Sequence, residues 1–302
     1  MNKLGHIAGI SFAIIFGFSF MFSKIALVYI SPMGLIAYRF LLAFVGFEIL
    51  RITKIIKVNV EKKYLLSVLL VALFQPVMYF IFETYGLTII TSSEAGMMIA
   101  LIPIFVTILS AVILKEKPTK LQILFIFVSA FGILLIQGMK TGFHINSSFL
   151  GFLLLFGAVF SAASFNIASR NASRKLKPQE ITYYMMLLGA VIFNLIYIIQ
   201  LGFNHNLIDY FYNILDIKII IPIFYLGVIA SIVGFFLVNY SLSKMPAHVS
   251  SVYANLSTVI AVMAGYVFLK EALYWYHIIG GILIIIGVYG VARGNIINTK
   301  KG

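Results

Sequence analysis

Residues 92–116 read SSEAGMMIALIPIFVTILSAVILKE, an almost unbroken apolar run that ends in Leu114-Lys115-Glu116. A second apolar run, residues 247–271, reads AHVSSVYANLSTVIAVMAGYVFLKE and ends in the same three residue types. A helix needs roughly 20 apolar residues to cross the hydrocarbon core of a bilayer, so each run predicts a membrane-spanning helix. The matching ends predict that the two halves of the chain share one plan.

Similar apolar runs recur along the whole chain of 302 residues. Only 10% of the residues are charged and 62% are hydrophobic, whereas a soluble domain is roughly 25% charged. Lipid must therefore surround most of the surface, and we predict an all-α integral membrane protein with ten transmembrane helices. The expected spans are 7–29, 32–50, 65–85, 92–114, 121–138, 149–169, 180–201, 219–240, 247–269 and 275–292.

The basic residues predict how these spans are oriented, because cytoplasmic loops carry an excess of Lys and Arg. With a cytoplasmic N-terminus, Lys140, Lys218 and Lys270 fall in outside loops, and Lys24 and Arg39 fall within spans. The other 17 of the 22 basic residues then lie inside. We therefore expect a multi-pass protein of the plasma (inner) membrane with both termini cytoplasmic. The net charge of +13 reflects this placement and does not predict a nucleic-acid partner.

An internal repeat extends beyond the two Leu-Lys-Glu ends. The same register aligns Tyr85 with Tyr240 and Gly132 with Gly287, and a shorter offset aligns Ser19 with Ser161 in the earlier spans. Each unit holds five spans, an odd number, so the second copy must be inverted. We expect the units to cover residues 1–140 and 141–302. Inverted repeats are common in secondary transporters, although repeats also build rigid scaffolds and apolar sequences can align by chance.

Several short patterns carry a resemblance to a known family. They are Phe16-Gly17, Pro32 with Arg39, the stretch from Tyr85 through Ser93, Glu94 and Ala95 to Pro103, Leu114-Lys115-Glu116, and Gly132. With these residues the chain resembles the EamA-like family of the drug/metabolite transporter superfamily, ten-helix bacterial metabolite exporters. The resemblance implies a five-plus-five inverted repeat and a central cavity lined mainly by spans 1, 3, 4, 6, 8 and 9.

Two positions depart from that family pattern. Thr258 stands where the first repeat has Pro103, so a helix break expected in span 4 should be missing from span 9. Span 1 has Ile15-Phe16-Gly17 in place of the usual Trp-Gly. Neither departure changes the expected fold. Both weaken any inference of the substrate from the family.

Four charged residues are expected in the outer half of the first repeat, namely Lys24, Arg39, Glu83 and Glu94. An unpaired charge in the bilayer centre is costly, so these residues predict a paired network that binds substrate or gates its path. The aligned positions of the second repeat are Asn166, Met185, Val238 and Val249, which places the charged network in one half only. Alternatively, the pairs only fix helices, or Lys24 and Arg39 extend to the interface.

Proton coupling has three candidates, Glu83, Glu94 and His248, because a carboxylate or imidazole can alternate between pairing and protonation. For His248 a solvated position at the interface is the alternative. The uncharged substrate candidates could instead form hydrogen bonds between helices. They are Gln75, Tyr79, Asn166, Asn239, Tyr253 and Asn255.

Small residues predict one close helix contact, between spans 5 and 10. They are Ser129, Gly132, Gly280, Gly281, Gly287 and Gly290. A dimer interface is the alternative use of this stripe, and we expect a monomer or a weak dimer.

The function predicted from these features is secondary transport of a small metabolite by alternating access, with export of amino acids or related compounds favoured by the resemblance. Alternatives are a carrier for cationic, quaternary-ammonium or nucleotide-type compounds in either direction, a non-transporting scaffold, and a lipid-modifying membrane enzyme. The chain has no Walker A loop, no His-Glu-x-x-His and no Gly-x-Ser-x-Gly, and it has no cysteine. We therefore expect no enzymatic activity, no metal and no cofactor, and protons as a possible coupling ion.

Overall fold

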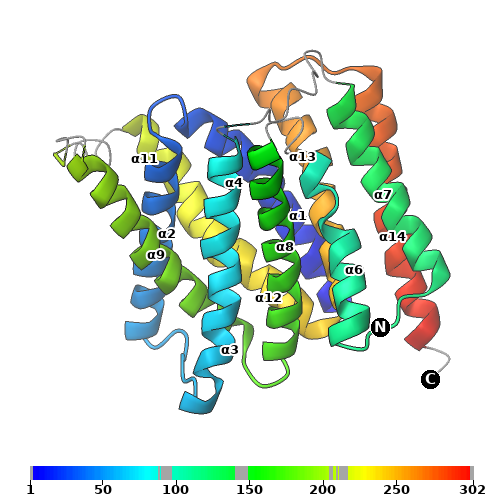
Figure 1. Ribbon diagram of the computed structural model, residues 1–302, viewed down its shortest axis with the longest axis horizontal. Coiled ribbons are helices and arrows are strands. Elements are labelled where there is room, and N and C mark those ends of the chain that lie inside the picture. Colours follow the sequence, from blue (N-terminus) through cyan, green and yellow to red (C-terminus); the bar gives the residue numbers. More distant parts are fainter. Residues whose placement is uncertain are drawn as a thin grey trace.

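A computed structural model describes residues 3–87, 89, 97–139, 149–203, 207–208, 210 and 217–299, with side chains as far as residue 294. This described part is a bundle of helices without strands (Figure 1). The helices are α1 (Lys3–Ala26), α2 (Pro32–Ile52), α3 (Lys62–Ala72), η1 (Leu73–Met78), α4 (Tyr79–Leu87), α6 (Ile102–Ile113), α7 (Lys120–Gly138), α8 (Phe149–Ala172), α9 (Pro178–Phe203), α11 (Ile217–Phe224), η2 (Tyr225–Gly234), α12 (Phe235–Lys244), α13 (Ala247–Leu269) and α14 (Trp275–Thr299).

Nine helices in the described ranges are long and apolar enough to cross a membrane. Two of them are composite: α3, η1 and α4 run on as Lys62–Leu87, and α11, η2 and α12 run on as Ile217–Lys244. A further apolar helix, Met97–Ile113, is shorter, because the first residues of the expected span 92–114 lie outside the described ranges. The protein is therefore an all-α, multi-pass membrane protein, as the sequence predicts.

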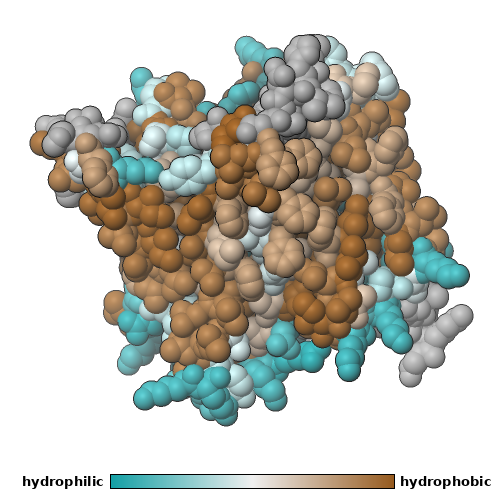
Figure 2. All heavy atoms as spheres, in the orientation of Figure 1, coloured by the Kyte–Doolittle hydropathy of each residue, from teal (hydrophilic) through white to brown (hydrophobic). Residues whose placement is uncertain are grey.

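The surface has the apolar belt that lipid requires. Figure 2 shows a wide hydrophobic band over the middle of the bundle, with hydrophilic residues concentrated at its two ends. Large apolar side chains in this band are freely exposed, such as Val112 at 72% and Phe149 at 84%. The first residues of α1 and the last of α14 lie at the same end of the bundle (Figure 1).

Local chemistry explains the tight connection between α1 and α2. The Ser31 hydroxyl accepts a hydrogen bond from the Gly34 N–H at 3.2 Å, which caps the first turn of α2. Pro32 fills the first helical position, where a missing N–H costs nothing. The helix therefore restarts after residues 27–31, but α1 packs mainly on α13 and α2 mainly on α9, so the two do not form a packed hairpin.

Helix breaks occur where prolines predict them. In η1, Gln75 leaves helical geometry at φ −147° and ψ 120°, directly before Pro76. A turn at residues 100–101 precedes Pro103, whereas α13 is continuous from Ala247 to Leu269. The expectation drawn from Thr258 is thus confirmed. The wide turns of η1 and η2 are rare in helices and occur frequently at functional sites.

The stripe of small residues packs α7 against α14 within the chain. A Cβ added to Gly280 would lie 2.6 Å from the Gly132 carbonyl oxygen, and one added to Gly287 would lie 2.5 Å from the Ser129 Cβ. Real Cβ atoms do not approach this closely, so the two helices meet through their backbones. The predicted contact between spans 5 and 10 is confirmed.

Replacing Gly287 with valine is therefore expected to separate α7 from α14 and to destabilise the fold by about 1–3 kcal/mol or more. Thermal unfolding of the purified protein in detergent measures the effect. Gly138, at the end of α7, is the control because no atom of the described residues lies within 4 Å of an added Cβ. Gly138→Ala should leave the unfolding temperature unchanged or raise it, and an equal loss in both variants would refute the close contact.

Candidate functional site

Arg39 is the most deeply placed cation of the described chain. It projects from α2 toward η2, where its Nε–H donates to the Ser231 hydroxyl at 2.7 Å. The guanidinium carbon lies 5.4 Å from the centroid of the Phe80 ring, and the residue is 9% exposed. A guanidinium with one neutral partner and an aromatic face keeps its terminal N–H groups available for an anion.

Tyr79 and Glu83 stand one turn apart on α4, close enough to Arg39 to interact with it electrostatically. The Tyr79 hydroxyl donates to the Glu83 Oε1 atom at 2.9 Å. No ion pair joins Arg39 to Glu83 in the described part of the chain, and the second Glu83 oxygen has no hydrogen-bond partner there. The structure thus brings together Arg39, Tyr79, Glu83 and Ser231, which we call the α2–α4 polar cluster.

Lys24 does not belong to this cluster. Its ammonium group pairs with Glu271, between α13 and α14, and the two side chains are 67% and 45% exposed. Lys24 was expected in one network with Glu83 and Glu94. That expectation is corrected, because the Lys24 side chain extends from α1 toward the segment after α13. Glu94 lies outside the described residues.

A second ion pair closes the other end of the bundle. Arg170 donates from Nε to Glu116 Oε1 and from Nη1 to the Leu242 carbonyl oxygen, both at 2.8 Å. Glu116 Oε2 also accepts from the Ala247 N–H at 2.8 Å. This arrangement ties the ends of α6, α8, α12 and α13 together.

His248 lies directly beside this ion pair. Its imidazole is 3% exposed, and Nδ1 is buried without a hydrogen-bond partner. The residue is close enough to Glu116 and Arg170 to interact with both charges. The alternative of a solvated histidine is therefore wrong, because α13 begins inside the packed end of the bundle.

Asn239 is fully occupied by protein partners. Its oxygen accepts from Ser169 at 2.6 Å, and its amide nitrogen donates to the Thr182 hydroxyl at 2.9 Å and to the Met185 sulfur at 3.4 Å. The residue is 0% exposed and links α12 to α8 and α9. A buried amide with these partners holds helices together.

The remaining uncharged candidates are scattered. Asn255 donates to Ser129 at 3.0 Å between α13 and α7, and among the described residues the Asn166 amide bonds only the Ala162 carbonyl of its own helix, at 2.9 Å. The Tyr253 hydroxyl contacts His6 Nδ1 at 2.7 Å, between α13 and α1. Gln75 is half-buried at the break in η1. Of the uncharged candidates, only Tyr79 joins the polar cluster.

Sequence reasoning missed several residues that the structure places at these sites. Ser231 is one small hydroxyl in an apolar segment, and nothing in its surroundings distinguishes it. Glu116 and Glu271 were visible as the shared Leu-Lys-Glu ends, but their partners lie far away in sequence. In the described part of the chain, no cluster of His, Asp or Glu is arranged to hold a metal ion.

Comparison with known proteins agrees with this architecture. The EamA-like transporter family matches residues 3–138 and again residues 149–293. The chain belongs to the EamA-like transporter family. Its relatives include the uncharacterized transporter YcxC of Bacillus subtilis, 37% identical over 94% of this chain and 91% of that protein. An uncharacterized transporter of Archaeoglobus fulgidus is 26% identical over 92% of this chain and 94% of that protein.

A solved crystal structure shares the fold of this EamA-like transporter, with a TM-score of 0.81 over 98% of both chains at 14% identity. The family and its relatives establish a membrane transporter. They do not name what it carries.

Proposed function

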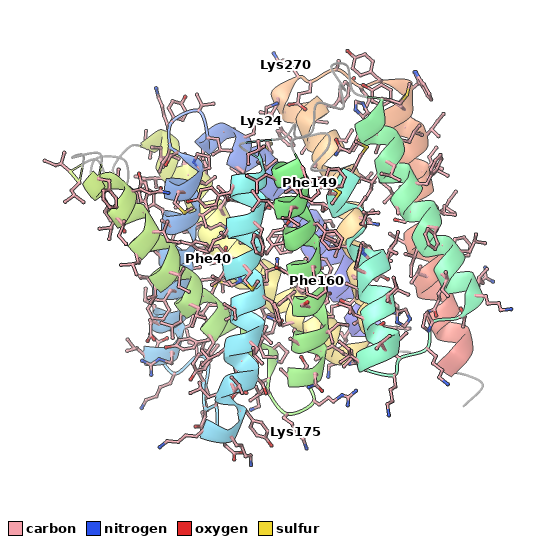
Figure 3. All side chains as sticks on the ribbon, in the orientation of Figure 1. Lys24, Phe40, Phe149, Phe160, Lys175 and Lys270 are labelled. Carbon is pink, nitrogen blue, oxygen red and sulfur yellow. The ribbon has the colours of Figure 1, made fainter. Side chains whose placement is uncertain are left out.

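We propose that this transporter is a secondary carrier of the plasma membrane that works by alternating access, with cytoplasmic termini and two inverted units over residues 1–140 and 141–302. Three features support the inverted arrangement. The family matches twice, η1 and η2 occupy corresponding helices, and α1 and α8 run in opposite directions. In Figure 3, Lys24 near the end of α1 and Phe149 at the start of α8 both lie toward the upper end, with Lys175 at the lower end.

The substrate class that the α2–α4 polar cluster supports best is a small zwitterion, such as an amino acid. Arg39 offers a planar fork of N–H groups that suits a carboxylate, and Glu83 keeps one oxygen that suits an ammonium group. The Phe80 ring next to Arg39 supplies an apolar face for a side chain. The single observation that carries this proposal is that buried Arg39 and half-buried Glu83 share one cluster without an ion pair between them in the described residues.

Export is the direction we propose, on the strength of the resemblance to metabolite exporters. A carrier that releases zwitterions outward needs a site that can open toward the outside. The cluster lies in α2 and α4, on the outer half expected for Arg39 and Glu83, while Arg170 and Glu116 close the opposite end.

A thermal-shift screen of the purified protein tests the substrate class. Neutral amino acids should raise the unfolding temperature, whereas their decarboxylated amines and their N-acetylated forms should have much smaller effects, because each lacks one charge. A quaternary-ammonium compound and a nucleotide complete the panel. Stabilisation by the amine equal to that by the amino acid would contradict a role for Arg39, and stabilisation by the nucleotide alone would replace the proposed substrate class.

Glu83→Gln is expected to uncouple transport from a proton gradient. The amide keeps the size of the side chain and its contact with Tyr79 but cannot take up and release a proton. We expect exchange of internal for external substrate in proteoliposomes to need a higher substrate concentration, because the ammonium group loses its carboxylate, but to remain measurable at saturation. Accumulation driven by a pH gradient should fall about tenfold or more even at saturation. Gradient-driven flux equal to that of the wild type would remove Glu83 from proton coupling.

A further inference from the structure

We propose that Lys24–Glu271 and Arg170–Glu116 are matched locks at opposite ends of the carrier, and that one can open only while the other stays closed; both are closed in this structure. This inference rests on the proposed alternating access and goes beyond it, because it names the contacts that divide the protein between its two states. The family match alone assigns no role to either pair.

The acidic residues of the two pairs sit in the same local structure. Lys115 and Lys270 both adopt the left-handed conformation, at φ 57° and 55°. The next residue then turns its N–H back to the preceding helix: Glu116 bonds the Ser110 carbonyl and Glu271 bonds the Gly265 carbonyl, each at 3.1 Å. The two carboxylates are thus placed by the same turn, one after α6 and the other after α13.

The basic residues also correspond. Lys24 lies two residues before the end of α1 at Ala26, and Arg170 lies two residues before the end of α8 at Ala172. The sequence alignment places Lys24 opposite Asn166 instead, one helical turn earlier. The ends of the helices and the identity of the partners make Arg170 the counterpart of Lys24, which corrects the expectation that Asn166 is.

The two pairs lie at opposite ends of the bundle. Figure 3 places Lys24 and Lys270 at the upper end and Lys175, five residues after Arg170, at the lower end. Each pair joins a helix of one unit to the end of a helix in the other: α1 to the segment after α13, and α8 to the segment after α6. Relative movement of the units could therefore open one contact while the other keeps the opposite end closed.

The two locks differ in strength in this structure. The Arg170 and Glu116 side chains are 23% and 13% exposed and share two further hydrogen bonds with backbone groups. Lys24 and Glu271 are 67% and 45% exposed, and no other hydrogen bond supports their contact in the described residues. Exposed ion pairs contribute little, so the present state is closed mainly by Arg170.

Distances between paired spin labels test the coupling of the locks, and the chain suits the method because it contains no cysteine. Val28→Cys with Ala272→Cys reports on the Lys24 end, and Asn171→Cys with Lys117→Cys reports on the Arg170 end. All four positions are exposed, so labels should not disturb packing.

Neutralising the stronger lock with Arg170→Gln and Glu116→Gln together avoids an isolated buried charge. We expect the population with a long distance at the Arg170 end to rise about tenfold, in line with the loss of a charged hydrogen bond, while the population with a long distance at the Lys24 end falls. Lys24→Gln should shift both populations in the opposite sense. The exchanged pair Lys24→Glu with Glu271→Lys should restore the distances of the wild type.

Lys63→Gln is the control, because it breaks the exposed pair with Glu61 away from both locks. It should change neither distance. If the two ion pairs were independent of each other, each substitution would change the distance at its own end only, and that result would overturn the proposal. An exchanged pair that fails to restore the distances would overturn it as well. The measurement needs no substrate, so opposed shifts without any flux would retain the locks and reject the proposed carrier function. Flux without opposed shifts would retain the carrier function and reject the locks.

Discussion

Arg39→Gln is expected to weaken binding of a zwitterionic ligand about 10- to 100-fold. The substitution removes the charged N–H groups that would hold a carboxylate, and hydrogen bonds to charged groups contribute about 1.5–3 kcal/mol each. It also leaves the Glu83 carboxylate without its nearest cation, in a cluster where Arg39 is only 9% exposed. Titration calorimetry on the detergent-solubilised protein measures the affinity directly.

Two further variants separate charge from geometry. Arg39→Lys keeps the charge but loses the planar fork and the Nε contact to Ser231, so an intermediate affinity is expected. Arg51→Gln is the matched control, because Arg51 forms an exposed pair with Glu48 at the end of the same helix. If Arg39→Gln bound the ligand like the wild type and only lowered the unfolding temperature, Arg39 would be a residue that fixes helices.

Asn239→Ala is expected to show the opposite pattern, a large loss of stability with unchanged ligand affinity. The substitution removes three hydrogen bonds at once and leaves the Ser169 hydroxyl buried without its partner. Each unsatisfied buried group costs about 1–3 kcal/mol, and hydrogen bonds between membrane helices contribute about 0.6–2 kcal/mol each, so a loss of about 2–4 kcal/mol is expected. Unfolding in a denaturing detergent measures it.

Asn166→Ala provides the comparison, since the Asn166 amide bonds only a carbonyl of its own helix. Its effect should stay below about 1 kcal/mol, because no contact between helices is lost. A variant of Asn239 that keeps its stability but no longer binds ligand would show instead that this amide reaches the substrate.

The membrane-spanning helices of the described residues could be predicted from sequence because lipid imposes a simple rule, whereas the side of the membrane that each end faces stays a prediction. A span must be apolar over about 20 residues, and short loops must carry charges of one sign on one side. The break expected in span 4 from Pro103 is found at 100–101, because proline cannot continue the backbone ladder, whereas Pro222 lies inside α11 without a break.

The partners of the polar residues could not be predicted in the same way. Arg39 and Glu83 come together because α4 meets α2 in the packed bundle, and this depends on packing rather than on local pattern. Lys24 was assigned to the wrong neighbour for the same reason, since depth in the membrane does not tell which side of a helix faces which partner. Asn239 and Asn255 resemble substrate contacts in sequence, yet both are held by serines of other helices.

Exchange in proteoliposomes tests most directly whether this protein carries zwitterions. Vesicles loaded with an unlabelled neutral amino acid and diluted into the radiolabelled form should accumulate label transiently, because a carrier returns loaded sites faster than empty ones. The same vesicles with Arg39→Gln should accumulate little, and those with Arg51→Gln should match the wild type. No transient accumulation by the wild-type protein, in vesicles where it is correctly folded and inserted, would contradict the proposed carrier.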